Sequence, residues 1–133
     1  MMAGSSHSLV LDSCVVVAHF RRNETVKATL LRASQLFMPL AAYGELYFGA
    51  LKAQRQAARL AELEEFMSVV TCVTPSQETA RIYAGLRLGL SQAGTPVPEN
   101  DIWIAATAKE LGLPLMTHDR HFQLFQGLEV VGS

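Results

Sequence analysis

The sequence contains little charge, and its charges of opposite sign nearly cancel. Only 17% of the 133 residues are charged, and 11 basic against 12 acidic side chains leave a net charge of −1. This balance argues against a protein that coats polyanions through general positive charge. Half of the residues are hydrophobic, which argues against a disordered chain. The length fits one domain with a substantial core.

Long hydrophobic runs are also absent. No apolar run approaches the roughly 20 residues that a membrane-spanning helix needs. The first seven residues, MMAGSSH, lack the basic start and the apolar segment of a signal peptide. We therefore expect residues 1–7 to form a disordered lead-in, and the protein to be cytoplasmic, with no membrane partner.

Cysteine is scarce, with Cys14 and Cys72 the only two in the chain. They are far apart and belong to no CxxC or Cys/His metal pattern. Both stand in apolar surroundings, so we expect them to pack in the core and not to form a disulfide.

Short apolar runs alternate with helical patterns along the chain. Strands are predicted at residues 8–11, 36–38, 69–73, 115–117 and 128–131. Helices are predicted at residues 15–20, 25–34, 41–52, 57–67, 77–92 and 101–111. Ser76 is the expected N-cap of the fifth helix, with Thr74 as the alternative, and Gly112 is expected to end the sixth. Strands separated by helices form βαβ units, so we predict one α/β domain over residues 8–133. It would have three α/β/α layers around a central, mainly parallel, five-stranded sheet.

Four acidic residues stand where carboxylates are costly. Asp12 ends the first strand, and Asp119 follows the fourth. Glu45 lies on an otherwise apolar helix, and Asp101 begins another. Ligands of parallel sheets bind outside the carboxyl ends of the strands, so we expect the four side chains to reach one crevice. Buried carboxylates are normally paired or bound to a metal, and four oxygen ligands favour Mg²⁺ or Mn²⁺.

Each acid also has a structural explanation. Asp12 could cap the following helix, Asp101 could interact favourably with a helix dipole, and Asp119 could be a turn residue. Glu45 is harder to explain, because no basic side chain lies four residues away on its helix. The combination is therefore more specific than any single residue.

In this order and spacing, Asp12, Glu45, Asp101 and Asp119 make the chain resemble the PIN-domain ribonucleases. Among these it is similar to the VapC-type toxins of type II toxin–antitoxin systems. The resemblance runs from LVLDS to GLEVV and is strongest in YGELYFGALKA, PVPENDIWIAATAKELGLPLMTHDRHF and LFQGLEVV. It implies a PIN-like fold, an Mg²⁺- or Mn²⁺-dependent endoribonuclease, and a VapB-like antitoxin as partner. The four acids would then be both catalytic and metal-binding residues.

The resemblance extends to polar neighbours of the acids. Ser13 preserves a hydroxyl beside Asp12, Asn100 would orient a carboxylate or cap the helix, and Thr117 would hydrogen-bond within the cluster. Cys14 departs from the pattern, since a polar residue is usual at this position. A thiol is a weaker donor and acceptor than such a residue.

Basic residues near the acids are candidates for binding RNA phosphates. Arg21 and Arg22 follow the first helix, and Arg120 adjoins Asp119. Ordinary solvated surface is the alternative for these side chains.

Two histidines lie beside the last of the four acids. His118 and His121 flank Asp119, but no third clustered His or Cys supports a zinc centre.

A homodimer could form through four residues of the helix at 41–52, which are Tyr43, Tyr47, Phe48 and Leu51.

Other functions also fit an acidic cluster on an α/β fold. A structure-specific DNA nuclease is disfavoured, because the chain has no room for the added helices that thread a strand. A phosphatase of the haloacid-dehalogenase type needs a second Asp where this chain has Cys14. A catalytically inactive PIN-fold module that binds RNA or a protein partner is a further alternative, because Cys14 departs from the family pattern.

Overall fold

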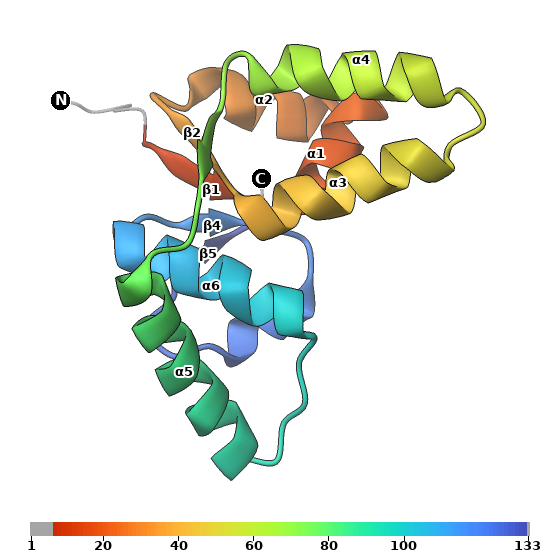
Figure 1. The fold of residues 1–133 in the computed structure, drawn as a ribbon. Helices are drawn as coiled ribbons and strands as arrows, with labels where there is room; N and C mark the ends of the chain where they lie inside the picture. Colours follow the sequence, from red (N-terminus) through yellow and green to blue (C-terminus); the bar gives the residue numbers. More distant parts are fainter. Residues whose placement is uncertain (1–6, 133) are drawn as a thin grey trace, which may run out of the picture.

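Five short strands, all parallel, form the sheet at the centre of the molecule (Figure 1). The structure is a computed structural model that describes residues 7–132. The strand order is β3-β2-β1-β4-β5. The bounds are Leu9–Leu11 for β1, Leu36–Pro39 for β2, Thr71–Val73 for β3, Leu115–Met116 for β4 and Val130–Val131 for β5. The predicted α/β fold with a parallel five-stranded sheet is confirmed.

Across the described residues 7–132, six α-helices connect the strands. Their bounds are Ser13–Phe20 for α1, Glu24–Arg32 for α2, Leu40–Lys52 for α3, Gln56–Met67 for α4, Gln77–Gln92 for α5 and Glu99–Leu111 for α6. Because crossovers between parallel strands are right-handed, α1 to α4 cover one face of the sheet. The chain then returns across the sheet from β3 to β4, so α5 and α6 cover the other face. Figure 1 shows these two groups of helices at the top and at the bottom.

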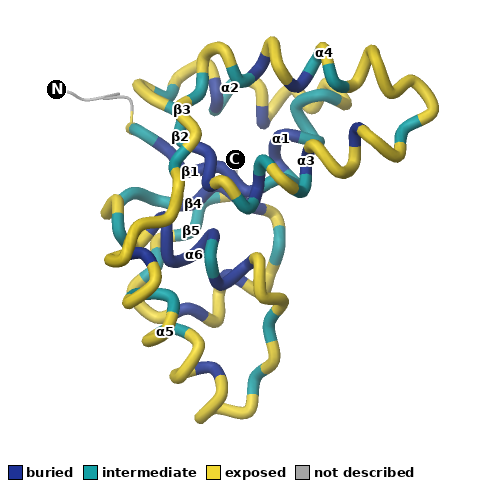
Figure 2. The backbone as a smooth tube through the Cα atoms, in the orientation of Figure 1, coloured by how far each residue is buried: buried dark blue, intermediate teal, exposed yellow. Residues whose placement is uncertain are grey.

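The core lies along the central strands and α6. All three residues of β1 are buried, as expected for a strand with neighbours on both sides. Helix α6 buries nearly every residue from Asp101 to Ala108, and Figure 2 shows this stretch as a dark tube beside the sheet. Helix α5 packs on α6 partly through Tyr83, whose ring stacks on Trp103 with centroids 4.1 Å apart.

Several predicted boundaries are confirmed by the local hydrogen bonds. Ser76, not Thr74, caps α5, and it forms a capping box with Thr79. Gly112 ends α6 in the left-handed conformation with φ of 67°. The start of α2 differs by one residue from the prediction: Asn23 caps this helix, which begins at Glu24 rather than Thr25.

Other boundaries differ from the prediction. Helix α6 begins at Glu99, directly after Pro98, so Asp101 lies inside the first turn and does not open the helix. Strand β3 begins at Thr71 because the N–H groups of Val69 and Val70 continue the end of α4 through hydrogen bonds to its carbonyls. Strand β5 is limited to Val130–Val131, which pair with β4 at the edge of the sheet.

The prediction that both cysteines pack in the core is wrong for Cys72 and holds in part for Cys14, which packs partly buried against the core. Cys72 lies on the edge strand β3 and is exposed, and Cys14 is half-buried among polar groups. Neither forms a disulfide, as expected.

In the predicted lead-in, residues 1–6 lie outside the described residues. The carbonyl of His7 accepts a hydrogen bond from the N–H of Ser34. Within residues 7–132, no helix is both long and apolar enough to span a bilayer.

Candidate metal-binding active site

Asp12 follows β1 directly and is fixed by three hydrogen bonds. As the N-cap of α1, it accepts the backbone N–H of Ser13 at 2.8 Å on Oδ1. Its Oδ2 accepts the hydroxyl of Thr117 at 2.7 Å and the thiol of Cys14 at 3.3 Å. The residue is 4% exposed. The capping role is therefore real, but it uses only one of the two carboxylate oxygens.

Thr117 and Cys14 connect Asp12 to the segment after β4. The Thr117 hydroxyl also accepts the backbone N–H of Asp119 at 3.0 Å, and the Cys14 sulfur accepts that of His118 at 3.4 Å. Burial raises the pKa of the Cys14 thiol, so the group remains a protonated donor near neutral pH. Cys14 therefore makes polar contacts at this position, although a thiol is a weaker donor and acceptor than the polar residue that is usual there.

Glu45, from α3, approaches the same place from another element. Its Oε1 accepts a hydrogen bond from the hydroxyl of Ser13 at 3.3 Å. Ser13 thus contacts two acids, because its backbone N–H donates to Asp12. Burial and the charge of Asp12 raise the pKa of Glu45, and hydrogen bonds with Ser13 and Asn100 oppose the rise. Asn100 thus favours the charged form of Glu45. It does not cap α6, because Pro98 occupies the N-cap position.

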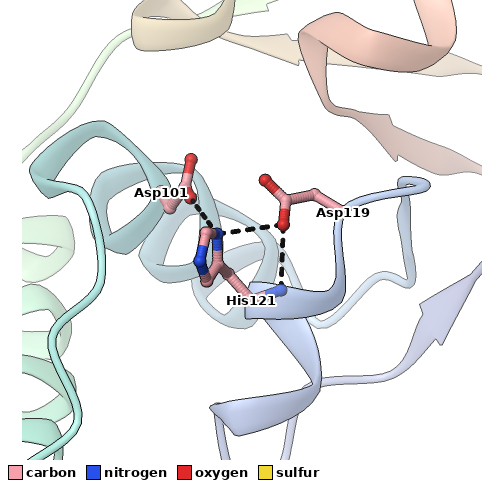
Figure 3. A group of neighbouring side chains, drawn as sticks. All are labelled: Asp101, Asp119 and His121. Carbon is pink, nitrogen blue, oxygen red and sulfur yellow. Dashed lines mark hydrogen bonds and ion pairs between the residues drawn. The ribbon is translucent and has the colours of Figure 1, made fainter.

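Asp101 and Asp119 meet around a residue that sequence reasoning missed as part of the site. Figure 3 shows the imidazole of His121 between the two carboxylates. Its Nδ1 lies 3.0 Å from Asp119 Oδ1 and 3.6 Å from Asp101 Oδ2. Asp119 also caps the short 3₁₀ helix Arg120–Leu124 by accepting the N–H of His121 at 2.9 Å. The spacing of two residues between Asp119 and His121 was the available signal.

The four carboxylates are close enough to repel one another. Burial, followed by the charges of neighbouring acids, raises the pKa of Asp101 to about 6. The neighbours responsible are Asp12, Asp119 and Glu45. The structure thus brings together the four acids that the sequence singled out. Carboxylate oxygens around a mostly buried position are donors suited to a hard divalent cation, which would relieve the repulsion.

The three candidate RNA-binding arginines are exposed but are not gathered in one place. Arg21 lines a groove of about 350 Å³ that also includes Ser13 and Glu45. Arg22, in the left-handed conformation with φ of 66°, lines a separate hollow with Glu65. Arg120 is exposed next to Asp119. Only Arg21 and Arg120 are therefore placed near the acids.

An all-parallel sheet with four carboxylates at one end of its strands defines an α/β domain with an acidic site suited to a divalent cation. The chain belongs to the PIN domain family, whose model matches residues 9–128.

Relatives within this family carry the name VapC. Over 121 residues the chain is 32% identical to the protein named Ribonuclease VapC5 of Mycobacterium tuberculosis, covering 89% of this chain and 87% of the relative. The structure is similar to that of VapBC-5 from the same organism, a member of the VapBC family of toxin-antitoxin systems. Here the TM-score is 0.75 and the identity 31%, over 93% of this chain and 97% of the other.

A second solved structure, of VapBC2 from Rickettsia felis bound to a promoter DNA fragment, gives a TM-score of 0.87. Its identity is 21%, and the match covers 93% of this chain and 97% of the other. At this identity the likeness concerns the fold, and it confirms the predicted PIN-like architecture.

Proposed function

We propose that the protein is a VapC-type toxin, an endoribonuclease that hydrolyses RNA phosphodiester bonds with Mg²⁺ or Mn²⁺. The observation that carries this proposal is the convergence of Asp12, Glu45, Asp101 and Asp119 at the carboxyl end of the sheet. The names of the similar proteins support the same reaction. The active unit is the single PIN domain of residues 8–133, acting in the cytoplasm, where its RNA substrate is found.

Asp12 and Asp101 are the principal metal ligands in this proposal, and Glu45 and Asp119 complete the set. A bound cation would lower the pKa of water and neutralise charge that develops on the phosphate. Thr117 and Cys14 fix the direction of the Asp12 carboxylate, so little reorganisation is needed when the substrate binds. Ser13 and Asn100 do the same for Glu45.

Glu45 is the proposed proton acceptor. Because burial and Asp12 raise its pKa above the ordinary value, its carboxylate is a better base than a solvated glutamate. Its Oε1 would take the proton of the attacking water, and in-line attack would leave 5′-phosphate and 3′-hydroxyl ends. Arg21 and Arg120 would contact the RNA phosphates on either side of the acids.

A VapB-like antitoxin is the proposed partner. A segment that places an arginine among the four carboxylates would neutralise their repulsion and exclude RNA at the same time. The groove beside Ser13, Glu45 and Arg21 gives such a segment access to the acids.

Cleavage of a mixed RNA pool in Mg²⁺ or Mn²⁺ tests this function. Wild type should cut, while Asp12→Asn and Asp101→Asn should lose at least about 100-fold in rate. Glu99→Gln is the matched control, because Glu99 lies in the same first turn of α6 but is exposed and pairs with Arg87. Identical fragments from wild type and both Asn variants would reveal a contaminating nuclease. A wild type that binds RNA without cutting it would support the inactive binding module, and preferential cutting of DNA would support a DNA nuclease.

A further inference from the structure

A nitrogen donor stands beside the four acids. His121 lies at the start of the 3₁₀ helix, and its backbone N–H is held by Asp119 Oδ1. Its side chain turns back toward the same carboxylate, with Nδ1 3.0 Å from Asp119 Oδ1. Asp101 Oδ2 lies 3.6 Å from the same nitrogen, from the other side (Figure 3). One ligand atom from each of the three residues lies within 4.8 Å of the others.

We propose that Nδ1 of His121 is a further metal ligand at this site, together with Asp101 and Asp119. The mixed nitrogen and oxygen donor set would make the site select a transition ion such as Mn²⁺ over Mg²⁺. This inference rests on the proposed metal-dependent function and deepens it by naming the donor that sets metal preference. It adds a residue to the four acids of the family pattern.

The two separations around Nδ1 suit ligands that share one ion. In a near-octahedral site with bonds of about 2.1 Å, adjacent ligand atoms lie about 3 Å apart. The separations of 3.0 and 3.6 Å around Nδ1 are close to this spacing. Mg²⁺ prefers oxygen ligands, whereas imidazole nitrogen binds first-row transition ions more strongly. Ligation would need the Nδ1 lone pair, which places the ring proton on Nε2.

His121 is suited to this role, and its neighbour His118 is not. Nε2 of His118 donates to the carbonyl of Gly132 at 2.6 Å, so this ring is engaged elsewhere. The His121 side chain is 47% exposed, and that of Asp101 only 11%. The imidazole thus stands at the open edge of the acidic cluster. Substitution of His118 is therefore the control for substitution of His121.

The affinities of the full-length protein for Mn²⁺ and Mg²⁺ test the assignment. We would measure Mn²⁺ binding by the electron paramagnetic resonance signal of free Mn²⁺, and Mg²⁺ binding by competition. His121→Ala should weaken Mn²⁺ binding about 10-fold or more and change Mg²⁺ binding by less than about 3-fold. His118→Ala should leave both unchanged. Equal weakening of both ions in His121→Ala would show a purely structural role and overturn the inference.

Nitrogen coupling to bound Mn²⁺ provides a direct second measurement. Electron spin-echo modulation of the Mn²⁺-loaded wild type should show an imidazole nitrogen, which is lost in His121→Ala and kept in His118→Ala. Mn²⁺ that binds without nitrogen coupling would overturn the role of His121 but leave the proposed ribonuclease intact. Absence of both Mn²⁺ and Mg²⁺ binding to wild type would overturn both.

Discussion

The hydroxyl of Thr117 donates a hydrogen bond to Asp12 Oδ2 at 2.7 Å, joining residues that are 105 positions apart in the sequence. The hydroxyl oxygen of Thr117 also accepts the backbone N–H of Asp119 at 3.0 Å. One buried hydroxyl therefore fixes the direction of one carboxylate and the position of the segment that carries another. Four predictions follow from this arrangement and from its surroundings.

Thr117→Val should lower both stability and activity. The variant leaves the N–H of Asp119 without this acceptor and removes a donor to a charged carboxylate, at a cost of about 1–3 kcal/mol of unfolding free energy. Misdirection of Asp12 should reduce RNA cleavage by about 10- to 100-fold. Thr107→Val is the control, since Thr107 is equally buried but bonds only to the Trp103 carbonyl within α6. A Thr117→Val protein that cleaves RNA at the wild-type rate would contradict this role.

Cys14 should be replaceable by serine but not by valine. Serine keeps a donor for Asp12 and an acceptor for the N–H of His118. Valine fills the space, removes one of the two donors to Asp12 Oδ2 and leaves the N–H of His118 without this acceptor. We expect Cys14→Ser to stay within a few-fold of the wild-type cleavage rate and Cys14→Val to lose about 10-fold. Cys72→Val, at an exposed cysteine, should have no effect on cleavage. Equal rates for the two Cys14 variants would mean that the thiol only fills space.

The stability of the metal-free protein should fall as pH rises from about 4 to about 6. Asp101 has a folded-state pKa of about 6, above its value in the unfolded chain. The folded state therefore binds more protons in this interval, and ionisation at higher pH removes the stabilisation. The contribution is on the order of 2–3 kcal/mol at most.

Urea denaturation in EDTA at several pH values measures this effect. Asp101→Asn should show a shallower fall in unfolding free energy than wild type, with a residual slope to which Glu45 contributes because its pKa is also raised. Glu99→Gln should keep the wild-type slope, since Glu99 lies outside the acidic cluster. Parallel curves for wild type and Asp101→Asn would contradict the raised pKa of Asp101.

The exposed apolar side chains of α3 should mediate a homodimer. Phe48 is 60% exposed, and Tyr47 and Leu51 lie exposed on the same helix. Tyr43, also suggested by the sequence, is half-buried and donates to Glu64 within the chain. Phe48→Glu should shift sedimentation from dimer to monomer, because burying a carboxylate in the contact is costly. Leu88→Glu, at a position of matched exposure (58%) on α5, should leave the dimer unchanged. A monomeric wild type would contradict the prediction.

The order of strands and helices could be predicted because each depends on neighbouring residues. The apolar run that contains Leu9–Leu11 predicted a buried strand, and Ser76 and Gly112 mark helix ends through contacts within one turn. The sequence also predicted that acids follow the strands, and in parallel sheets the carboxyl ends of strands share one edge. Together these local features were enough to bring the four carboxylates into one hypothesis.

What the sequence could not predict depends on contacts between distant segments. The polar partners of Cys14 were not predicted, because Thr117 and His118 are about a hundred residues away and meet it only when β4 pairs with β1. Cys72 is exposed because β3 is an edge strand, which its short apolar sequence does not reveal.

The sequence by itself determined the parallel α/β fold and the four acids, because periodicity and strand ends are local properties of the chain. Only the tertiary structure decided what each acid touches. Packing of α6 on the segment after β4, together with the pairing of β4 with β1, turned His121 toward Asp101 and Asp119 and placed Thr117 on Asp12. Side-chain direction at such a site follows from the packing of distant elements, which the spacing of residues along the chain indicates only in part.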